Sequence, residues 1–539
     1  MYISKGGKHA VVIDPKPYES PIKEGGVTYQ DSYLINLATG DKKLILKKSK
    51  FTLYPSDNGL YCTYYQDKQW WLVDNATGKV FCLTKGIKAD FSDVDYDGPQ
   101  TERPFERLPF WLKEDKALLL FDKYDCYLAD PASGKVKKIT NGASDKAIFR
   151  SLDIDDDEEA PAVDKPLYFS VFTEDTKKSG LALLDKKEGL KLLILDDKQM
   201  GLFSRAKQAD RIMFVMQSFE ESPSIYITNS VFSQAKPVHK TNEQQSKYAW
   251  EKAELISYKA MGKDLHGALI YPAGYKAGRM YPMITYIYER MSDGLHNYAV
   301  PSDRNPYDVQ VWSQNGYFVL MPDITYKTRQ PGISANICLG EALKAVFAKR
   351  VGVDRQRVGL VGHSWGGYQT AFSIVTTKFF AAAIAGAPLT DLIEMYNSFY
   401  WNSGEANQVI FEGGQGRMEV PWWKDLKAYM DNSPVFQAEK LTGRLMIAFG
   451  DSDGAVDWHQ GQYLFNTLKR MGKNVVMLVY PGENHGLAKK ANQIDYASRG
   501  RHFFDVYLKG VKPEPWLAEG YPYQKKLENQ NKPSQIKSQ

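Results

Sequence analysis

The sequence has little of what several protein classes require. Its 539 residues contain only four cysteines, Cys62, Cys82, Cys126 and Cys338, and none of them forms a CxxC pair. That number is too small for a disulfide framework, and the missing CxxC argues against a structural zinc site. We therefore expect buried free thiols, with a bridge between Cys62 and Cys82 as the alternative. No run reaches the roughly 18 apolar residues of a membrane-spanning helix.

The charge is also nearly balanced, at +5 in total, and it is spread without a long basic block. Such a balance favours neither nucleic acid nor an anionic membrane as a partner. The first residues, MYISKGGKHAVVIDP, do not show the charged, apolar and small-residue order of a signal peptide. Because the first structural unit looks incomplete, we expect that the true start is missing. The compartment, periplasmic or cytoplasmic, therefore stays unknown.

The first part of the chain contains a repeated sequence phrase. The phrases YLINLATGDKKLIL, WLVDNATGKVFCL and YLADPASGKVKKI occupy 33–46, 71–83 and 127–139. Their turn glycines, Gly40, Gly78 and Gly134, are spaced 38 and 56 residues apart, and weaker copies follow at 181–195 and 224–238. Four-stranded units at such spacing are typical of propeller blades, with the Gly turn joining the outer two strands. Residues 1–245 are thus predicted to be an all-β propeller of about five blades that is truncated at its N-terminus. A β-sandwich is the alternative.

After that region the pattern changes to strands alternating with helices. The expected strands are 268–274, 281–288, 317–324, 357–364, 381–388, 444–451 and 474–482. Most are continuous apolar runs, as in strands covered on both faces, and helical stretches such as 340–350 and 460–472 separate them. Residues 246–520 are therefore predicted to be an α/β hydrolase domain with a doubly wound, mostly parallel sheet. The end, 521–539, reads as a polar tail.

A candidate nucleophile lies in this second region. The run RVGLVGHSWGGYQTAFSIV reads as a strand, then Gly362-His363-Ser364-Trp365-Gly366, then a helix. This is a GxSxG nucleophile elbow, in which glycines are needed because the serine sits in a strained turn. The start of the following helix points its amides at a developing oxyanion. The order of elements predicts Ser364 as a nucleophile.

A serine nucleophile needs a base and an orienting carboxylate, which in this fold follow it in the order acid, then histidine. AFGDSDGAVDWHQG follows one late strand, and VYPGENHG follows the next. These positions favour Asp453 as the acid and His485 as the base. Asp451 and Asp457 are rival acids, although Asp451 can instead cap the following turn.

GHSWGGY, GDSDGAV and GENHG, in this order behind a propeller-like segment, resemble the prolyl oligopeptidase family of serine peptidases. The resemblance is clear over 245–515 and covers 1–240 only in architecture. It implies Ser364 as nucleophile, Asp453 as orienting acid and His485 as general base and acid. It also implies that the Tyr288 hydroxyl and the Trp365 amide stabilise the oxyanion. Tyr288 alone would otherwise read as a core aromatic.

The sequence also departs from the family. Dipeptidyl-peptidase relatives carry an asparagine two residues after the acid, where this chain has Ala455. Glu220-Glu221 is a pair similar to the glutamates that bind a free N-terminus there, and it reads as a solvated turn. Dipeptide release is therefore not favoured. By alignment, Met395 and Phe399 in the aromatic-rich insertion 389–435 match walls of the primary specificity pocket; packing of the insertion onto the sheet is the alternative.

We therefore expect a serine-type peptidase that cleaves oligopeptides, which the propeller admits by size. An esterase with the same triad and an inert binding protein are the two alternatives. No cofactor or metal is expected. Asp93-Val-Asp95-Tyr-Asp97-Gly98 begins like a calcium loop, but its twelfth position is Pro104, not glutamate. Cleavage preference and assembly, including a possible homo-oligomer, stay open.

Overall fold

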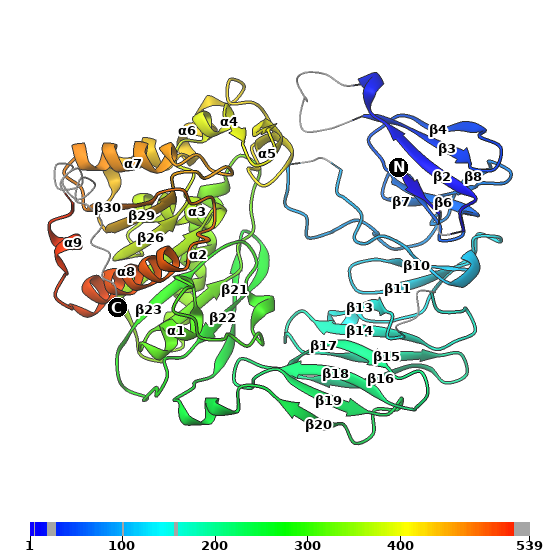
Figure 1. Ribbon diagram of the computed structural model, residues 1–539, viewed down its shortest axis with the longest axis horizontal. Helices are drawn as coiled ribbons and strands as arrows, with labels where there is room; N and C mark the ends of the chain where they lie inside the picture. Colours follow the sequence, from blue (N-terminus) through cyan, green and yellow to red (C-terminus); the bar gives the residue numbers. More distant parts are fainter. Residues whose placement is uncertain (5, 19–28, 100–101, 156–159, 522–539) are drawn as a thin grey trace, which may run out of the picture.

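The structure is a computed structural model that describes residues 1–4, 6–18, 29–99, 102–155 and 160–521. It contains two domains side by side: strand-only sheets come first in the chain, and a mixed domain of strands and helices follows (Figure 1). The expected polar tail falls on residues outside the described ranges, apart from Tyr521. Within those ranges, no helix combines the length and the apolar character needed to cross a bilayer.

The described residues of the N-terminal domain form five sheets of four antiparallel strands each. The first and second sheets contain β1 (Tyr2–Ile3), β2 (His9–Asp14), β3 (Gln30–Asn36), β4 (Lys42–Ser49), β5 (Tyr54–Pro55), β6 (Tyr61–Gln66), β7 (Gln69–Asp74) and β8 (Val80–Cys82). The third and fourth contain β9 (Phe110–Trp111), β10 (Leu118–Phe121), β11 (Cys126–Ala129), β12 (Val136–Lys138), β13 (Ala147–Leu152), β14 (Leu167–Thr173), β15 (Ser179–Asp185) and β16 (Gly189–Asp196). The fifth contains β17 (Gln199–Arg205), β18 (Ile212–Gln217), β19 (Ser224–Thr228) and β20 (Lys236–Lys240).

The repeated phrase forms the turn between the outer two strands of a sheet, as the sequence predicted. In the second sheet the turn joins β7 to β8: the Asp74 carboxylate accepts hydrogen bonds from the amides of Ala76 and Thr77, at 3.0 and 2.8 Å. The Gly78 amide then donates to the Asp74 carbonyl, with Gly78 at φ 70°. Asn36 and Asp130 accept the matching bonds in the first and third sheets. The phrase recurs because the turn needs two things. An Asn or Asp side chain accepts hydrogen bonds from the backbone amides two and three residues later, and a glycine then adopts a positive φ.

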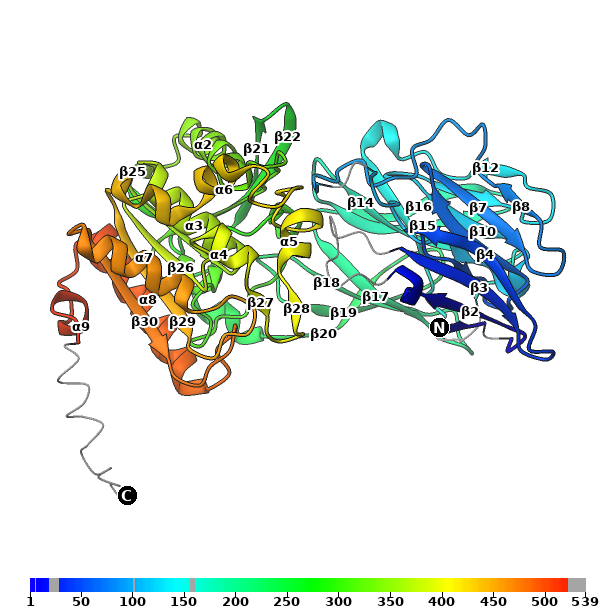
Figure 2. The ribbon, with the colours of Figure 1, turned by 90° about the horizontal axis from the view of Figure 1, so that it is seen from above.

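Each sheet packs against the next through its own hydrophobic cluster. Trp70, for example, is fully buried between the second and third sheets, and Phe169 is fully buried between the third and fourth. The five sheets follow one another in an arc, from β1–β4 at one end to β17–β20 at the other (Figures 1 and 2). All four cysteines are free; Cys82 is partly exposed and the others are buried.

The C-terminal domain is built on one eight-stranded sheet with the order β21-β22-β24-β23-β25-β26-β29-β30. Its strands are β21 (Ala253–Ala260), β22 (Lys263–Ile270), β23 (Tyr281–Tyr286), β24 (Phe318–Pro322), β25 (Val353–His363), β26 (Ala382–Gly386), β29 (Arg444–Gly450) and β30 (Val475–Tyr480). The pairs from β24 to β30 are parallel, whereas β21, β22 and β24 pair antiparallel. Strand β21 and the antiparallel pairing of β22 were not predicted from the sequence, because a strand's direction depends on its partners.

Helices cover both faces of this sheet (Figure 2). They are α1 (Val309–Gln314), α2 (Pro331–Ala348), α3 (Trp365–Thr376), α4 (Leu392–Tyr396), α5 (Gln408–Gly413), α6 (Leu426–Asn432), α7 (His459–Arg470), α8 (Lys490–Lys509) and α9 (Pro515–Ala518). Helices α2, α3 and α7 pack into one buried cluster, and α1, α8 and α9 pack into another on the opposite face. Covering on both faces explains the continuous apolar runs in the sequence. It also leaves the carboxyl ends of the parallel strands as the natural place for a site.

Candidate active site

Ser364 lies in the sharp turn between β25 and α3, with φ 59° and ψ −120°. This is a backbone region that residues with a Cβ rarely adopt, so the surrounding structure must hold it. The flanking glycines explain how it does so. A Cβ on Gly362 would lie 2.4 Å from the carbonyl oxygen of Gly366, and a Cβ on Gly366 would lie 2.4 Å from the carbonyl oxygen of Ile287. Only glycine fits at either position.

Asp453 and His485 meet at the carboxyl end of the sheet, as their positions in the sequence suggested. They lie on the loops after β29 and β30, and His485 Nδ1 is 2.8 Å from Asp453 Oδ2 and 3.1 Å from Oδ1. The Asp453 side chain is fully buried, and its Oδ1 also accepts hydrogen bonds of 2.9 Å from the amides of Ala455 and Val456. A carboxylate fixed in this way holds one tautomer of the imidazole, with Nδ1 protonated and Nε2 free to accept a proton.

The rival carboxylates have other partners. Asp451 is exposed and accepts a 2.6 Å hydrogen bond from the amide of Gly482, so it ties the two late loops together. Asp457 lies 2.6 Å from Nδ1 of His459, the first residue of α7. Within the described residues, the hydrogen bonds between His485 and a carboxylate are those to Asp453.

The loop that carries His485 is anchored by Glu483, which the sequence analysis did not single out. Its buried carboxylate accepts hydrogen bonds from the amides of Ala488 and Lys489, at 2.6 and 3.1 Å, and from the Asn492 side chain at 2.6 Å. Burial alone would raise the pKa of this carboxyl, but these hydrogen bonds lower it below its usual value. Glu483 stays ionised and fixes both sides of the His485 loop. The available signal was an acidic residue two positions before a candidate base.

The two expected oxyanion donors lie beside the elbow. Tyr288 follows the end of β23, and its ring is close enough that a Cβ on Gly366 would be 3.4 Å from Tyr288 Cδ2. Tyr288 is 38% exposed, so part of the residue is open to solvent. Trp365 is the first residue of α3, where the amide is not used by the helix and lies at the positive end of the helix dipole.

His363, the residue before the serine, packs against the candidate base. Its ring lies 4.8 Å from that of His485, and its Nδ1 is 3.2 Å from the Tyr307 hydroxyl. Burial, together with the nearby His485, lowers the pKa of His363 to about 4. His363 therefore stays neutral when His485 takes up a proton, and it adds no second positive charge to the site.

Replacing His363 with glutamine should reduce the acid sensitivity of the fold. An unfolded histidine binds a proton below about pH 6.5, whereas the folded His363 does so only near pH 4. The wild type therefore loses stability as the pH falls from 6.5 to 4, by up to about 3 kcal/mol from this group. The free energy of unfolding, measured from pH 7 to pH 4, should fall less steeply for His363→Gln than for the wild type.

The exposed His239 provides the matched control. His239→Gln should keep the wild-type dependence of the unfolding free energy on pH. Equal slopes in all three proteins would contradict this assignment.

Met395 and Phe399 lie in the aromatic-rich insertion but in different environments. Met395, in α4, is 3% exposed and belongs to the main core cluster. Phe399 is 46% exposed and packs against Trp401, with ring centroids 5.2 Å apart. The insertion does reach the site: the Asn402 amide donates to the Gly454 carbonyl, next to Asp453, at 2.9 Å.

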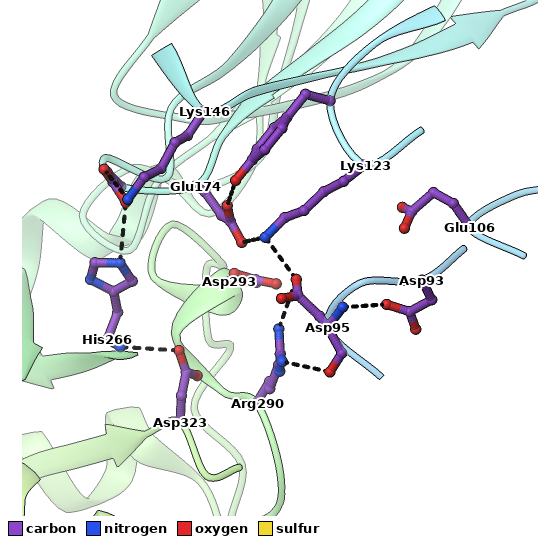
Figure 3. Close-up of polar contacts among 12 residues, drawn as sticks. Asp93, Asp95, Glu106, Lys123, Lys146, Glu174, His266, Arg290, Asp293 and Asp323 are labelled. Atoms are coloured by element: carbon purple, nitrogen blue, oxygen red, sulfur yellow. Dashed lines mark hydrogen bonds and ion pairs between the residues drawn. The ribbon is translucent and has the colours of Figure 1, made fainter. Parts of the chain in front are cut away.

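A cavity of about 1030 Å³ lies between the two domains, and Tyr288 lines it. Charged side chains from both domains face it (Figure 3). Lys123 of the propeller lies 2.8 Å from Asp95 and 2.7 Å from Glu174. Although burial would lower the pKa of Lys123, the two carboxylates raise it, so the lysine stays charged. Arg290 of the C-terminal domain reaches Asp95 across the domain boundary, at 3.5 Å. The acidic run that begins like a calcium loop is thus used in ion pairs.

Comparison with known proteins places these residues in a family. Residues 340–511 match the family model described as the prolyl oligopeptidase family. This part of the C-terminal domain matches the prolyl oligopeptidase family. The match includes Ser364, Asp453 and His485 within its bounds. It confirms the resemblance that the sequence motifs indicated.

The individual relatives that match this chain are distant. Dipeptidyl peptidase 8 of Mus musculus is 25% identical over 299 residues, which is 50% of this chain and 31% of that protein. An uncharacterised peptidase of Bacillus subtilis is 24% identical over 162 residues, which is 29% of this chain and 23% of that protein. The chain thus spans less than a third of the length of each of these curated relatives.

Solved structures show the same fold. A puromycin-hydrolysing peptidase of Mycobacterium tuberculosis superposes with a TM-score of 0.63 at 15% identity, covering 95% of this chain and 79% of that one. An acylaminoacyl peptidase of Pyrococcus horikoshii superposes with a TM-score of 0.55 at 16% identity, covering 97% and 90%. Together with the five four-stranded sheets and the mixed sheet, these likenesses confirm the predicted fold class of a propeller followed by an α/β hydrolase domain.

Proposed function

We propose that this chain is a serine-type peptidase that hydrolyses oligopeptides through Ser364, His485 and Asp453. The observation that carries the proposal is the buried Asp453 carboxylate on His485 Nδ1, beside a serine held in a strained elbow. Ion pairs between histidine and aspartate are common, but this one lies at the carboxyl edge of the sheet next to a nucleophile elbow. The family match supports peptide-bond chemistry.

The reaction then proceeds in two halves. Ser364 Oγ attacks the carbonyl carbon while His485 Nε2 takes the hydroxyl proton, and Asp453 stabilises the imidazolium without taking the proton itself. His485 gives that proton to the leaving amine as the carbon–nitrogen bond breaks, which leaves an acyl ester on Ser364. In the second half, water gives a proton to His485 and attacks the ester carbonyl, and the proton then returns to Ser364 Oγ as the acid is released.

Tyr288 is proposed to donate its hydroxyl hydrogen bond to the oxyanion, together with the Trp365 amide. Tyr288→Phe removes only that hydroxyl, and it should lower kcat about a hundredfold with a small change in KM, because the bond strengthens as charge develops. Steady-state hydrolysis of a peptide anilide measures both constants. The control Tyr286→Phe changes the tyrosine two residues earlier, and it should leave kcat within about twofold of the wild type. An unchanged kcat in Tyr288→Phe would exclude its hydroxyl from the oxyanion hole.

The substrate class is proposed from the cavity between the domains. A space of about 1030 Å³ bounded by the propeller admits short, extended peptides and excludes folded chains. Relatives are named for dipeptidyl, acylaminoacyl and puromycin substrates, so their names support amide hydrolysis without choosing a residue preference. We propose Met395 and Phe399 as walls that favour proline, alanine or another apolar residue before the scissile bond.

A comparison of amides with esters tests this proposal. Anilides of proline, alanine, lysine and glutamate, each in a short blocked peptide, should be hydrolysed, with the apolar residues preferred. Short acyl esters should be hydrolysed as well, because the alcohol of an ester is a better leaving group than the amine of an amide. Turnover of the esters alone would support an esterase instead. Turnover of neither, without labelling of Ser364 by a fluorophosphonate, would indicate an inert binding protein.

A further inference from the structure

We propose that docking of the propeller loop 93–98 onto the hydrolase domain positions the oxyanion donors, with Asp97, Arg417 and Gln369 as the positioning residues. The inference rests on the proposed function, because it concerns the same site. It adds that the propeller does more than restrict substrate size: one of its carboxylates is needed for full activity at Ser364.

The first link is the ion pair between Asp97 and Arg417, which are 320 residues apart. Asp97 Oδ1 accepts hydrogen bonds from Arg417 Nη2 at 2.8 Å and from Nε at 3.1 Å. The other oxygen, Oδ2, accepts from the Thr325 hydroxyl and from the Tyr326 amide, each at 3.1 Å. A single propeller carboxylate therefore binds two separate segments of the hydrolase domain.

Arg417 connects Asp97 to the segment that carries Tyr288. Its Nη1 donates to Glu289, the residue after Tyr288, at 2.9 Å, and its guanidinium lies 3.9 Å from the centre of the Tyr326 ring. Arg417 is 8% exposed and has φ 54°, a conformation that costs a residue with a Cβ free energy. A buried cation at a strained position loses much of its support when its carboxylate partner is removed.

The second link is Gln369, a fully buried residue of α3. In the amide orientation that satisfies all its neighbours, its nitrogen donates to the Tyr288 carbonyl at 2.8 Å. Its oxygen then accepts from Trp365 Nε1 at 3.2 Å and from the Tyr326 hydroxyl. One amide thus ties the residues that carry both proposed oxyanion donors to the tyrosine beneath Arg417.

These contacts form a continuous path from the propeller to the oxyanion hole. The path runs from Asp97 to Arg417, then to Glu289 and Tyr326, and from Tyr326 through Gln369 to Tyr288 and Trp365. Catalytic hydrogen bonds depend steeply on position, and a misplacement of about 1 Å can cost on the order of a hundredfold in rate. A domain that docks through Asp97 therefore influences the transition state without touching the substrate.

The test replaces Asp97 with asparagine, which keeps the shape and removes the charge. We expect the rate of Ser364 labelling by a fluorophosphonate, and kcat for a peptide anilide, to fall about tenfold with little change in KM. The matched control is Asp293→Asn, which removes another cross-domain pair, 2.6 Å from Lys177 Nζ, outside the path. It should leave both rates within about twofold of the wild type.

A double-mutant cycle separates positioning from a merely structural role. Because part of the effect of Asp97 runs through Tyr288, the loss caused by Asp97→Asn should be clearly smaller in a Tyr288→Phe background, with the remainder acting through Trp365, whereas a structural defect would add in full. If Asp97→Asn fails to fold, Arg417→Lys provides the second test. It keeps the positive charge but loses the paired N–H groups that bind Asp97, and it should lower the labelling rate and kcat as expected for Asp97→Asn. Full labelling and turnover in both variants, or an equal loss with and without the Tyr288 hydroxyl, would overturn the inference alone. A wild type that neither labels nor cleaves would overturn the proposed function as well.

Discussion

Replacing Ser364 with alanine should abolish peptide hydrolysis, lowering kcat by about 10⁵- to 10⁶-fold. The substitution removes only the nucleophilic oxygen, and the strained turn is held by the glycines on either side. Binding should therefore survive, and the residual rate should reflect only the oxyanion donors and substrate orientation. Anilide hydrolysis, with substrate binding measured separately by fluorescence or calorimetry, checks both expectations.

The control for this variant is Ser373→Ala, near the other end of the same helix, α3. The Ser373 hydroxyl donates a 2.6 Å hydrogen bond to the Asn336 side chain. Ser373→Ala should keep wild-type kcat while testing whether a lost hydroxyl in α3 disturbs the domain. Activity of Ser364→Ala near the wild-type level, in protein free of contaminating peptidase, would show that another group performs the attack.

Replacing Asp453 with asparagine should lower kcat about 10⁴-fold. An amide in place of the carboxylate donates to the imidazole instead of only accepting, so it favours the tautomer with Nδ1 unprotonated and Nε2 protonated. That nitrogen can then no longer take the Ser364 proton at neutral pH. The measurement is kcat for a peptide anilide across pH, and a partial recovery at high pH is expected where hydroxide or ionised serine supplies the missing base.

The rival carboxylates make this prediction specific. Asp451→Asn and Asp457→Asn should each leave kcat within about tenfold of the wild type, because their hydrogen bonds go to Gly482 and His459. An effect of Asp451→Asn or Asp457→Asn equal to that of Asp453→Asn would mean that the loop, and not one carboxylate, is what the reaction requires.

Those parts of the site that depend on short sequence patterns and on the order of strands and loops could be predicted from the sequence. The elbow could be predicted because its sequence pattern is local: Gly362 is required by the approach of the Gly366 carbonyl oxygen four residues later, although Gly366 itself is required by a contact with Ile287. The positions of Asp453 and His485 followed from the rule that loops after parallel strands converge at one edge. The blade turns were predictable for the same reason, since Asp74 and Gly78 make their bonds within one turn.

The remaining features depend on contacts between distant segments. The antiparallel pairing of β22 with β24 and the existence of β21 depend on which strands become neighbours, which periodicity does not reveal. Met395 and Phe399 share an expected role in the sequence, yet one is buried and the other exposed. The Asp97–Arg417 pair joins residues 320 positions apart, and no pattern in a single sequence connects them.

Identification of the residue that carries a covalent adduct tests the central claim most directly. The full chain would be incubated with a fluorophosphonate, with and without an excess of a blocked oligopeptide substrate, and the adduct mapped by mass spectrometry. We predict one adduct, on Ser364, formed more slowly when the peptide is present because both occupy the same site. An adduct on a different residue, or labelling of Ser364 that no oligopeptide slows, would contradict a peptidase built on Ser364, His485 and Asp453.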